Sequence, residues 1–155
     1  MAGSAVLVAS IALILHVFSV IVWVGGMFFA VVVLRPASGP LDPAVRLALW
    51  RRVFAGFFPW VFVAIVLLLI SGFTLFLGGF AIGRHVHIMM GIGILMMLIF
   101  GHIYFAPWKR FRRALDAGEN AAAAAQLNQV RILVTLNLLL GLLTAAIGSS
   151  GRYWG

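Results

Sequence analysis

Long apolar runs without a charged side chain dominate the chain. They cover residues 5–34, 53–83, 86–108 and 132–150, if the histidines are neutral. About 20 apolar residues, each rising about 1.5 Å along a helix, cross the hydrocarbon core of a bilayer. The pattern therefore predicts an all-α, polytopic membrane protein. We expect one domain, residues 1–155, folded as a four-transmembrane-helix bundle with helices at about 5–34, 53–82, 86–108 and 130–149.

The segments that flank these runs carry signals for helix boundaries. Asp42 precedes Pro43, which is typical of an N-cap residue followed by the first residue of a helix. Gly118 predicts a break between a helical extension of the third run and an alanine-rich lead into the fourth. The first run is too long for a signal-peptide core and no basic residue precedes it. We therefore expect it to be a retained membrane helix.

Charge supports the membrane assignment and predicts an orientation. Only 9% of the residues are charged, whereas soluble domains have about a quarter. Of the 11 Lys and Arg residues, nine lie between the first and second or the third and fourth runs, and two, Arg84 and Arg152, lie opposite. This asymmetry predicts a multi-pass protein of the bacterial inner membrane with both termini outside. The basic loops suit anionic lipid headgroups better than nucleic acid.

Several kinds of chemistry are excluded by the residue types. The chain has no cysteine, so disulfides, thiolate ligands and iron–sulfur clusters are absent. Its three acids, Asp42, Asp116 and Glu119, all lie in connecting segments, which argues against a carboxylate relay inside the membrane. No internal repeat supports an inverted-repeat transporter.

Histidines inside the apolar runs are the strongest candidates for function. In the third run, helical geometry places His87, Gly91 and His102 on one side, and His85, Met89 and Met96 on nearly the opposite side. Glycine one turn from an imidazole leaves room for a flat macrocycle. Thioethers beside an imidazole form a soft site suited to Cu(I).

For the side that carries His87, Gly91 and His102, the main hypothesis is a haem b group bound between two helices. His16 of the first run shares a helix face with Trp23. His16 lies about 6 Å outward of the membrane midplane, whereas His87 lies about 14 Å outward and His102 about 9 Å inward. His16 therefore pairs more easily with His87, and the pairing with His102 stays open. Arg84, one turn outward of His87, suits the haem propionates.

Structural roles compete with ligation at each of these positions. A membrane histidine can simply hydrogen-bond a neighbour, although intramembrane ionisable groups are costly and usually functional. His85 lies beside Arg84 at the interface, where a solvated surface residue is the simpler interpretation. Methionines such as Met89 and Met96 more often serve adaptable packing.

A family resemblance covers nearly the whole chain. The segments "LHVFSVIVWVGGMFF", "LRPA", "HVHIMMGIG", "FGHIYFAPWKRFRRAL", "LNQVRILVTLNLLLGLLT" and "GRYWG" together resemble the CopD-like family of bacterial membrane proteins. The resemblance implies copper import or copper resistance, with functional histidines at His16, His87 and His102, and less securely at His85. A more distant similarity is to the four-helix protoporphyrinogen oxidases that bind haem b. Those carry a lysine where this chain has Met89.

Two functional classes follow. The first is an integral membrane haem b protein that transfers electrons, with His16, His87 and His102 as candidate ligands and Arg84, Gly91 and Trp23 beside the cofactor. The alternative is a membrane protein for Cu(I) transport or copper resistance that uses His and Met ligands. Apart from the bilayer, the expected partner is an unidentified redox or metal-handling protein, and a homo-oligomer stays open.

Overall fold

Four long helical segments form the molecule, as the sequence predicts. The computed structural model describes residues 2–154, apart from the side chains of Ala2 and Arg152, and within this range it contains helices and no strand. The elements, in chain order, are α1 (Ala2–Phe28), the π-helix η1 (Phe29–Leu34), α2 (Arg35–Ala37), α3 (Pro43–Leu77), α4 (Arg84–Phe105), α5 (Pro107–Asp116), α6 (Asn120–Ser150) and the 3₁₀-helix η2 (Gly151–Tyr153).

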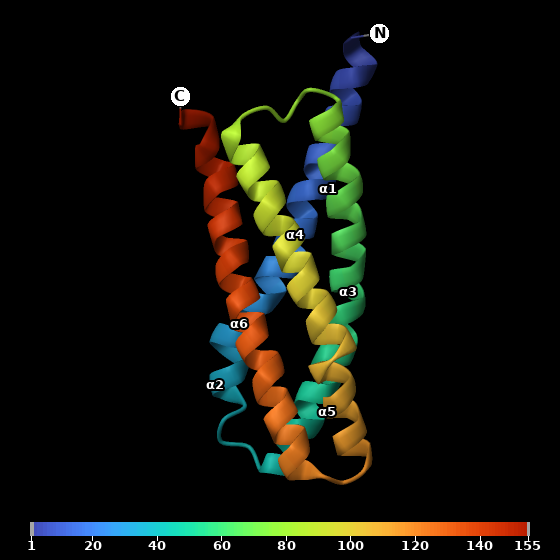
Figure 1. The fold of residues 1–155 in the computed structure, drawn as a ribbon, viewed down its shortest axis with the longest axis vertical. Coiled ribbons are helices and arrows are strands. Elements are labelled where there is room, and N and C mark those ends of the chain that lie inside the picture. Colours follow the sequence, from blue (N-terminus) through green and yellow to red (C-terminus); the bar gives the residue numbers. More distant parts are fainter. Residues whose placement is uncertain (1, 155) are drawn as a thin grey trace.

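The bundle has two different ends (Figure 1). The 78–83 connection and the two ends of the chain lie together, and we name this the terminal end. The connections 38–42 and 117–119 lie at the opposite end, together with the strongly basic α5, and we name this the basic end. All four long segments are apolar and long enough to cross a membrane.

Helix boundaries differ from the limits of the apolar runs where caps and glycines act. The α3 helix begins at Pro43 because the Asp42 side chain accepts a 2.9 Å hydrogen bond from the backbone N–H of Ala44, which confirms the predicted cap. The same helix ends at Leu77, and Gly79 follows with φ 73°, a backbone conformation that favours glycine. Gly118, with φ 74°, makes the predicted break before α6.

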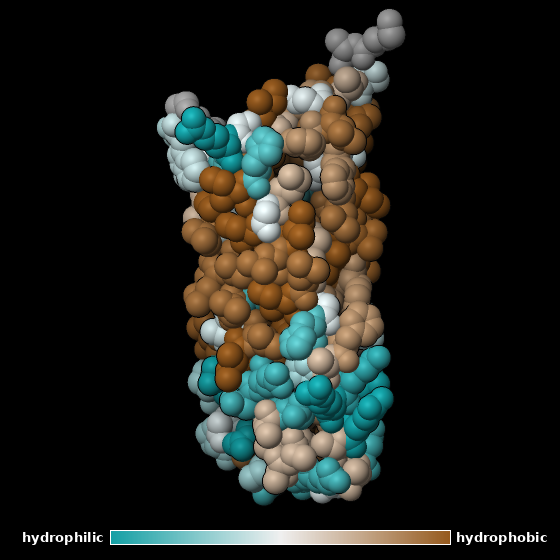
Figure 2. Space-filling model, in the orientation of Figure 1, coloured by the Kyte–Doolittle hydropathy of each residue, from teal (hydrophilic) through white to brown (hydrophobic). Residues whose placement is uncertain are grey.

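Apolar side chains cover the middle of the bundle on the face seen in Figure 2. Large apolar side chains point outward from every long helix, for example Phe18 at 63%, Leu98 at 67% and Leu139 at 59% exposure. Polar residues gather mainly at the basic end. Such a surface is stable only against lipid, so the chain is a multi-pass membrane protein in contact with the bilayer.

Buried packing is concentrated toward the basic end. There, Phe58 of α3 stacks on Phe54 at 5.1 Å between ring centroids and meets Trp108 of α5 edge-on at 5.3 Å. Toward the terminal end the buried side chains are mostly small: Ala9, Ala12, Ser19 and Ser71, with Ile147. Helix α1 packs mainly on α3 and α4 mainly on α6, and these two pairs stand apart toward the terminal end (Figure 1).

Candidate metal site at the terminal end

His16 of α1 is held by a serine of α3. Its Nδ1 atom lies 3.0 Å from the Ser71 hydroxyl oxygen. That hydroxyl donates its own hydrogen to the carbonyl of Leu67 at 2.6 Å, so the oxygen is left to accept from His16. When the hydroxyl donates to Leu67, the neutral imidazole carries its proton on Nδ1, and Nε2 keeps the lone pair that a metal ion needs.

The ring of His16 lies against the backbone of α3. A Cβ atom built at Gly72 would be 3.5 Å from Cε1 of the imidazole, an ordinary contact distance. The half-buried ring therefore packs beside the α3 backbone at a distance that would also accommodate an alanine.

His87 of α4 has the same arrangement of its two nitrogens. Its Nδ1 donates to the carbonyl oxygen of Gly83 at 3.1 Å, because a carbonyl can only accept. In the neutral form of this ring, Nε2 again carries a free lone pair. The exposed ring also meets Phe76 of α3 edge-on, with 5.7 Å between centroids.

The two imidazoles therefore contact neighbouring positions of one helix face. Gly72, which His16 contacts, and Phe76, which His87 contacts, are four residues apart on α3 and separated by about 6 Å along its axis. Residues of α1 and α4 that are far apart in sequence thus converge on one turn of α3. Each can present an unprotonated Nε2 atom as a metal ligand.

The stripe of His85, Met89 and Met96 packs against small residues of the C-terminal helical segment. A Cβ at Gly148 would lie 2.8 Å from Cε of Met89, and one at Gly141 would lie 3.1 Å from Cε of Met96. The His85 side chain contacts the backbone of Gly151 in η2 and packs edge-on to Trp154 at 6.4 Å. These contacts are those of a packed seam between α4 and α6.

The other predicted residues are spread over the molecule. His102 is exposed on the lipid-facing side of α4, fifteen residues or about 22 Å along the helix from His87. Trp23 is buried and edge-on to Phe100 at 6.2 Å, about 10 Å along α1 from His16. Arg84 is exposed at the start of α4, and a Cβ at Gly91 would meet nothing within 4 Å.

Only some of the predicted ligand residues therefore lie close enough together to share a metal ion or haem b. Among residues 2–154, no group of three or more His, Asp or Glu side chains is placed to hold a metal ion. Of the predicted haem site, the structure brings only the two imidazoles to the same turn of α3, and Gly91 is at an exposed position of α4 with open space beside it. Trp23 and His102 lie too far from them to complete it.

Three residues that contact the imidazoles were not singled out in the sequence: Ser71, Gly72 and Phe76. The only signal was a serine–glycine pair inside an otherwise apolar run. Such a pair in a membrane helix usually serves helix packing, so its partner became visible only in the folded molecule.

The fold and this site define a polytopic α-helical membrane protein with two imidazoles gathered at one end. Residues 51–150, about two thirds of the sequence, match the family of copper resistance protein D. The chain belongs to that family. Comparisons with curated proteins and with solved structures gave no match. The matched range includes Ser71, Gly72 and His87, whereas His16 precedes it.

Proposed function

We propose that this protein carries Cu(I) into or across the bacterial inner membrane, with His16 and His87 as the first intramembrane ligands. Membership of the copper resistance protein D family is the observation that carries the proposal. The two imidazoles that meet one turn of α3, each with its Nδ1 in a hydrogen bond, support the choice of ligands. With both termini outside, as the distribution of basic residues predicts, the ion would enter at the terminal end.

Charge favours Cu(I) over Cu(II) as the transported ion. No acidic residue lies in the apolar runs, so the ligands available within the membrane are neutral imidazoles and thioethers. Neutral ligands leave the full charge of the ion in a medium of low dielectric constant, where the cost rises steeply with charge. A singly charged, soft ion suits these ligands better than a doubly charged one.

The protein prepares both imidazoles before the ion arrives. Ser71 and the Gly83 carbonyl hold the Nδ1 protons, so neither ring has to release a proton to bind Cu(I). Ligands on α1 and α4 would also bring together the two helix pairs that stand apart at this end.

Copper uptake by proteoliposomes containing the purified protein, with Cu(I) kept reduced, tests the proposal. We expect His16→Ala and His87→Ala each to lower the initial uptake rate at least tenfold. The matched control is His102→Ala, which removes an exposed imidazole of α4 and should change the rate less than twofold. Equal rates for His87→Ala and His102→Ala would contradict the assignment of His87.

The thioethers are tested in the same assay. Replacement of both Met89 and Met96 by leucine keeps the volume of the seam nearly constant, so the protein should fold. Their contacts with Gly148 and Gly141 favour a packing role, and we expect uptake to be retained. Loss of uptake in a folded double variant would instead make this stripe part of the copper route.

Haem b is the second candidate, because the free Nε2 atoms and the open space at Gly91 also suit it. An absorption spectrum of protein expressed with ample haem separates the two. A Soret band that is lost in His16→Ala and His87→Ala would establish haem, and its absence would remove this candidate.

A further inference from the structure

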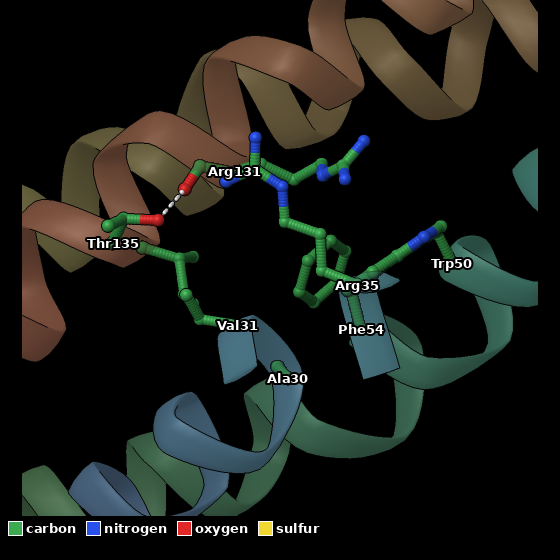
Figure 3. A pocket seen from close by; sticks show the side chains of 8 residues that line it. Ala30, Val31, Arg35, Trp50, Phe54, Arg131 and Thr135 are labelled. Carbon is green, nitrogen blue, oxygen red and sulfur yellow. Dashed lines mark hydrogen bonds between the residues drawn. The ribbon is translucent and has the colours of Figure 1, made fainter. Parts of the chain in front are cut away.

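A small hollow near the basic end is lined by one apolar wall and one cationic wall (Figure 3). Ala30, Val31 and Val134 form part of the apolar wall, and Arg35 and Arg131 contribute the guanidinium groups. Its volume is about 10 Å³, room for about one water molecule or one oxygen atom of a larger ligand. Ala30 and Val31 belong to the π-helix η1. A π-helix is rare in proteins, and where one occurs it is often at a functional site.

Arg131 is the least satisfied charge in the hollow. Its guanidinium lies over the ring of Trp50 at 5.6 Å, but its buried Nε atom has no hydrogen-bond partner among residues 2–154. The positive charges of Arg35 and Arg46 also act on it. A buried N–H without an acceptor is costly, and three neighbouring cations repel one another, so the group lacks an anion.

The chain itself does not supply that anion. It has only three acids: Asp116 joins Arg51 in the one ion pair within the described range, and Glu119 forms no ion pair there. Asp42 is engaged as the cap of α3. An external anion is therefore the natural partner of Arg131.

The cationic wall is held in place by hydrogen bonds to neutral acceptors. Trp50 donates its indole N–H to the Ser38 hydroxyl at 3.2 Å, and Ser38 donates to the carbonyl of Arg35 at 3.1 Å. Arg46 donates to the carbonyl of Gly39 at 3.1 Å. These bonds fix the 38–42 turn beside the hollow while leaving the positive charges uncompensated.

We propose that this hollow binds the phosphate group of an anionic phospholipid. The apolar wall suits acyl chains, as do the exposed side chains of Val32 and Val33 in η1 and Ile132 in α6. The guanidinium groups suit a phosphate. The residues that line the hollow belong to η1, α2, α3 and α6, so a bound lipid would stabilise the packing of these elements.

Thermal unfolding of the purified full chain in mild detergent tests this site. Phosphatidylglycerol should raise the unfolding temperature of the wild type, whereas phosphatidylcholine at the same concentration should not. In Arg131→Gln and Arg35→Gln, the phosphatidylglycerol concentration for half of this effect should rise about fivefold, the equivalent of about 1 kcal/mol per lost cation. Because Arg35 is exposed, its variant should fold even if Arg131→Gln does not.

The matched control is Arg110→Gln, which removes an exposed cation from α5 outside the hollow. We expect its phosphatidylglycerol dependence to equal that of the wild type. An equal loss in Arg110→Gln would overturn the site in favour of general surface attraction. Stabilisation by inorganic phosphate as large as that by phosphatidylglycerol would overturn the assignment to a lipid.

Discussion

One hydroxyl group decides which nitrogen of His16 is able to bind a metal. When Ser71 gives its hydrogen to the backbone of its own helix, its oxygen is free to accept a hydrogen bond from the protonated Nδ1 of His16. Without that acceptor, the imidazole is free to rotate and to place its proton on Nε2. The hydroxyl therefore orients the ligand without touching the ion.

Ser71→Ala should accordingly weaken copper binding without unfolding the protein. Loss of a hydrogen-bonding partner behind a ligating histidine typically costs 10–100-fold in metal affinity or activity. We expect a fall of that size in Cu(I) affinity, measured by competition with a chromophoric chelator. Ser10→Ala is the control, because Ser10 makes the same type of backbone hydrogen bond but contacts no histidine. An affinity equal to that of the wild type would remove Ser71 from the site.

At the scale of the helices, small residues of α6 determine how closely α1 and α4 approach α6. The sequence predicts a stripe of Asn137, Gly141, Thr144 and Gly148 that faces the bundle. Gly141 confirms this role, since a Cβ there would lie 2.8 Å from Cγ2 of Val24 on α1. Val24 is branched and buried, so it has little room to move aside.

Gly141→Ala should therefore destabilise the bundle. Overpacking of this kind costs about 1–3 kcal/mol, and we expect a lower unfolding temperature in detergent. The matched control is Gly93→Ala on α4, where a Cβ would meet nothing within 4 Å. Alanine favours a helix over glycine by about 1 kcal/mol, so this variant should be at least as stable as the wild type. A Gly141→Ala variant as stable as Gly93→Ala would contradict the tight contact.

For the whole molecule, the distribution of basic residues predicts orientation. Nine of the 11 Lys and Arg residues lie near the basic end by their place in the sequence. We expect a reporter that is active only in the cytoplasm to be active when inserted at Gly118 and silent when fused after Gly155. The reverse pattern would place the paired imidazoles on the cytoplasmic side and reverse the proposed direction of copper entry.

The sequence predicts the fold well because lipid imposes a strict rule. A chain crosses lipid only as an α-helix or within a closed β-barrel, and apolar runs of this length indicate four helices. The boundaries are less predictable, since helices such as α3 extend beyond the apolar run into a basic segment. Asp42 and Gly118 marked two of those boundaries correctly.

The candidate site is less visible in the sequence than the fold. Histidine positions and depths indicate that His16 and His87 belong to the same half of the membrane. The rotation of each helix about its axis depends on packing across the bundle, which no single run contains. For this reason Ser71 and Phe76 were missed, and the seam between Met89 and Gly148 became apparent only in the structure.

The uneven distribution of buried side chains has a consequence for folding cooperativity. Local opening requires least free energy where few large side chains interlock, and that region is the terminal end. Amide hydrogens of the terminal halves of α1 and α4 should therefore exchange faster than those around Phe58 and Trp108. A ligand held between α1 and α4 would slow that exchange selectively, because it adds a link that the apolar side chains do not provide. A bound metal ion would then stabilise the terminal end in the way that buried side chains stabilise the rest of the bundle.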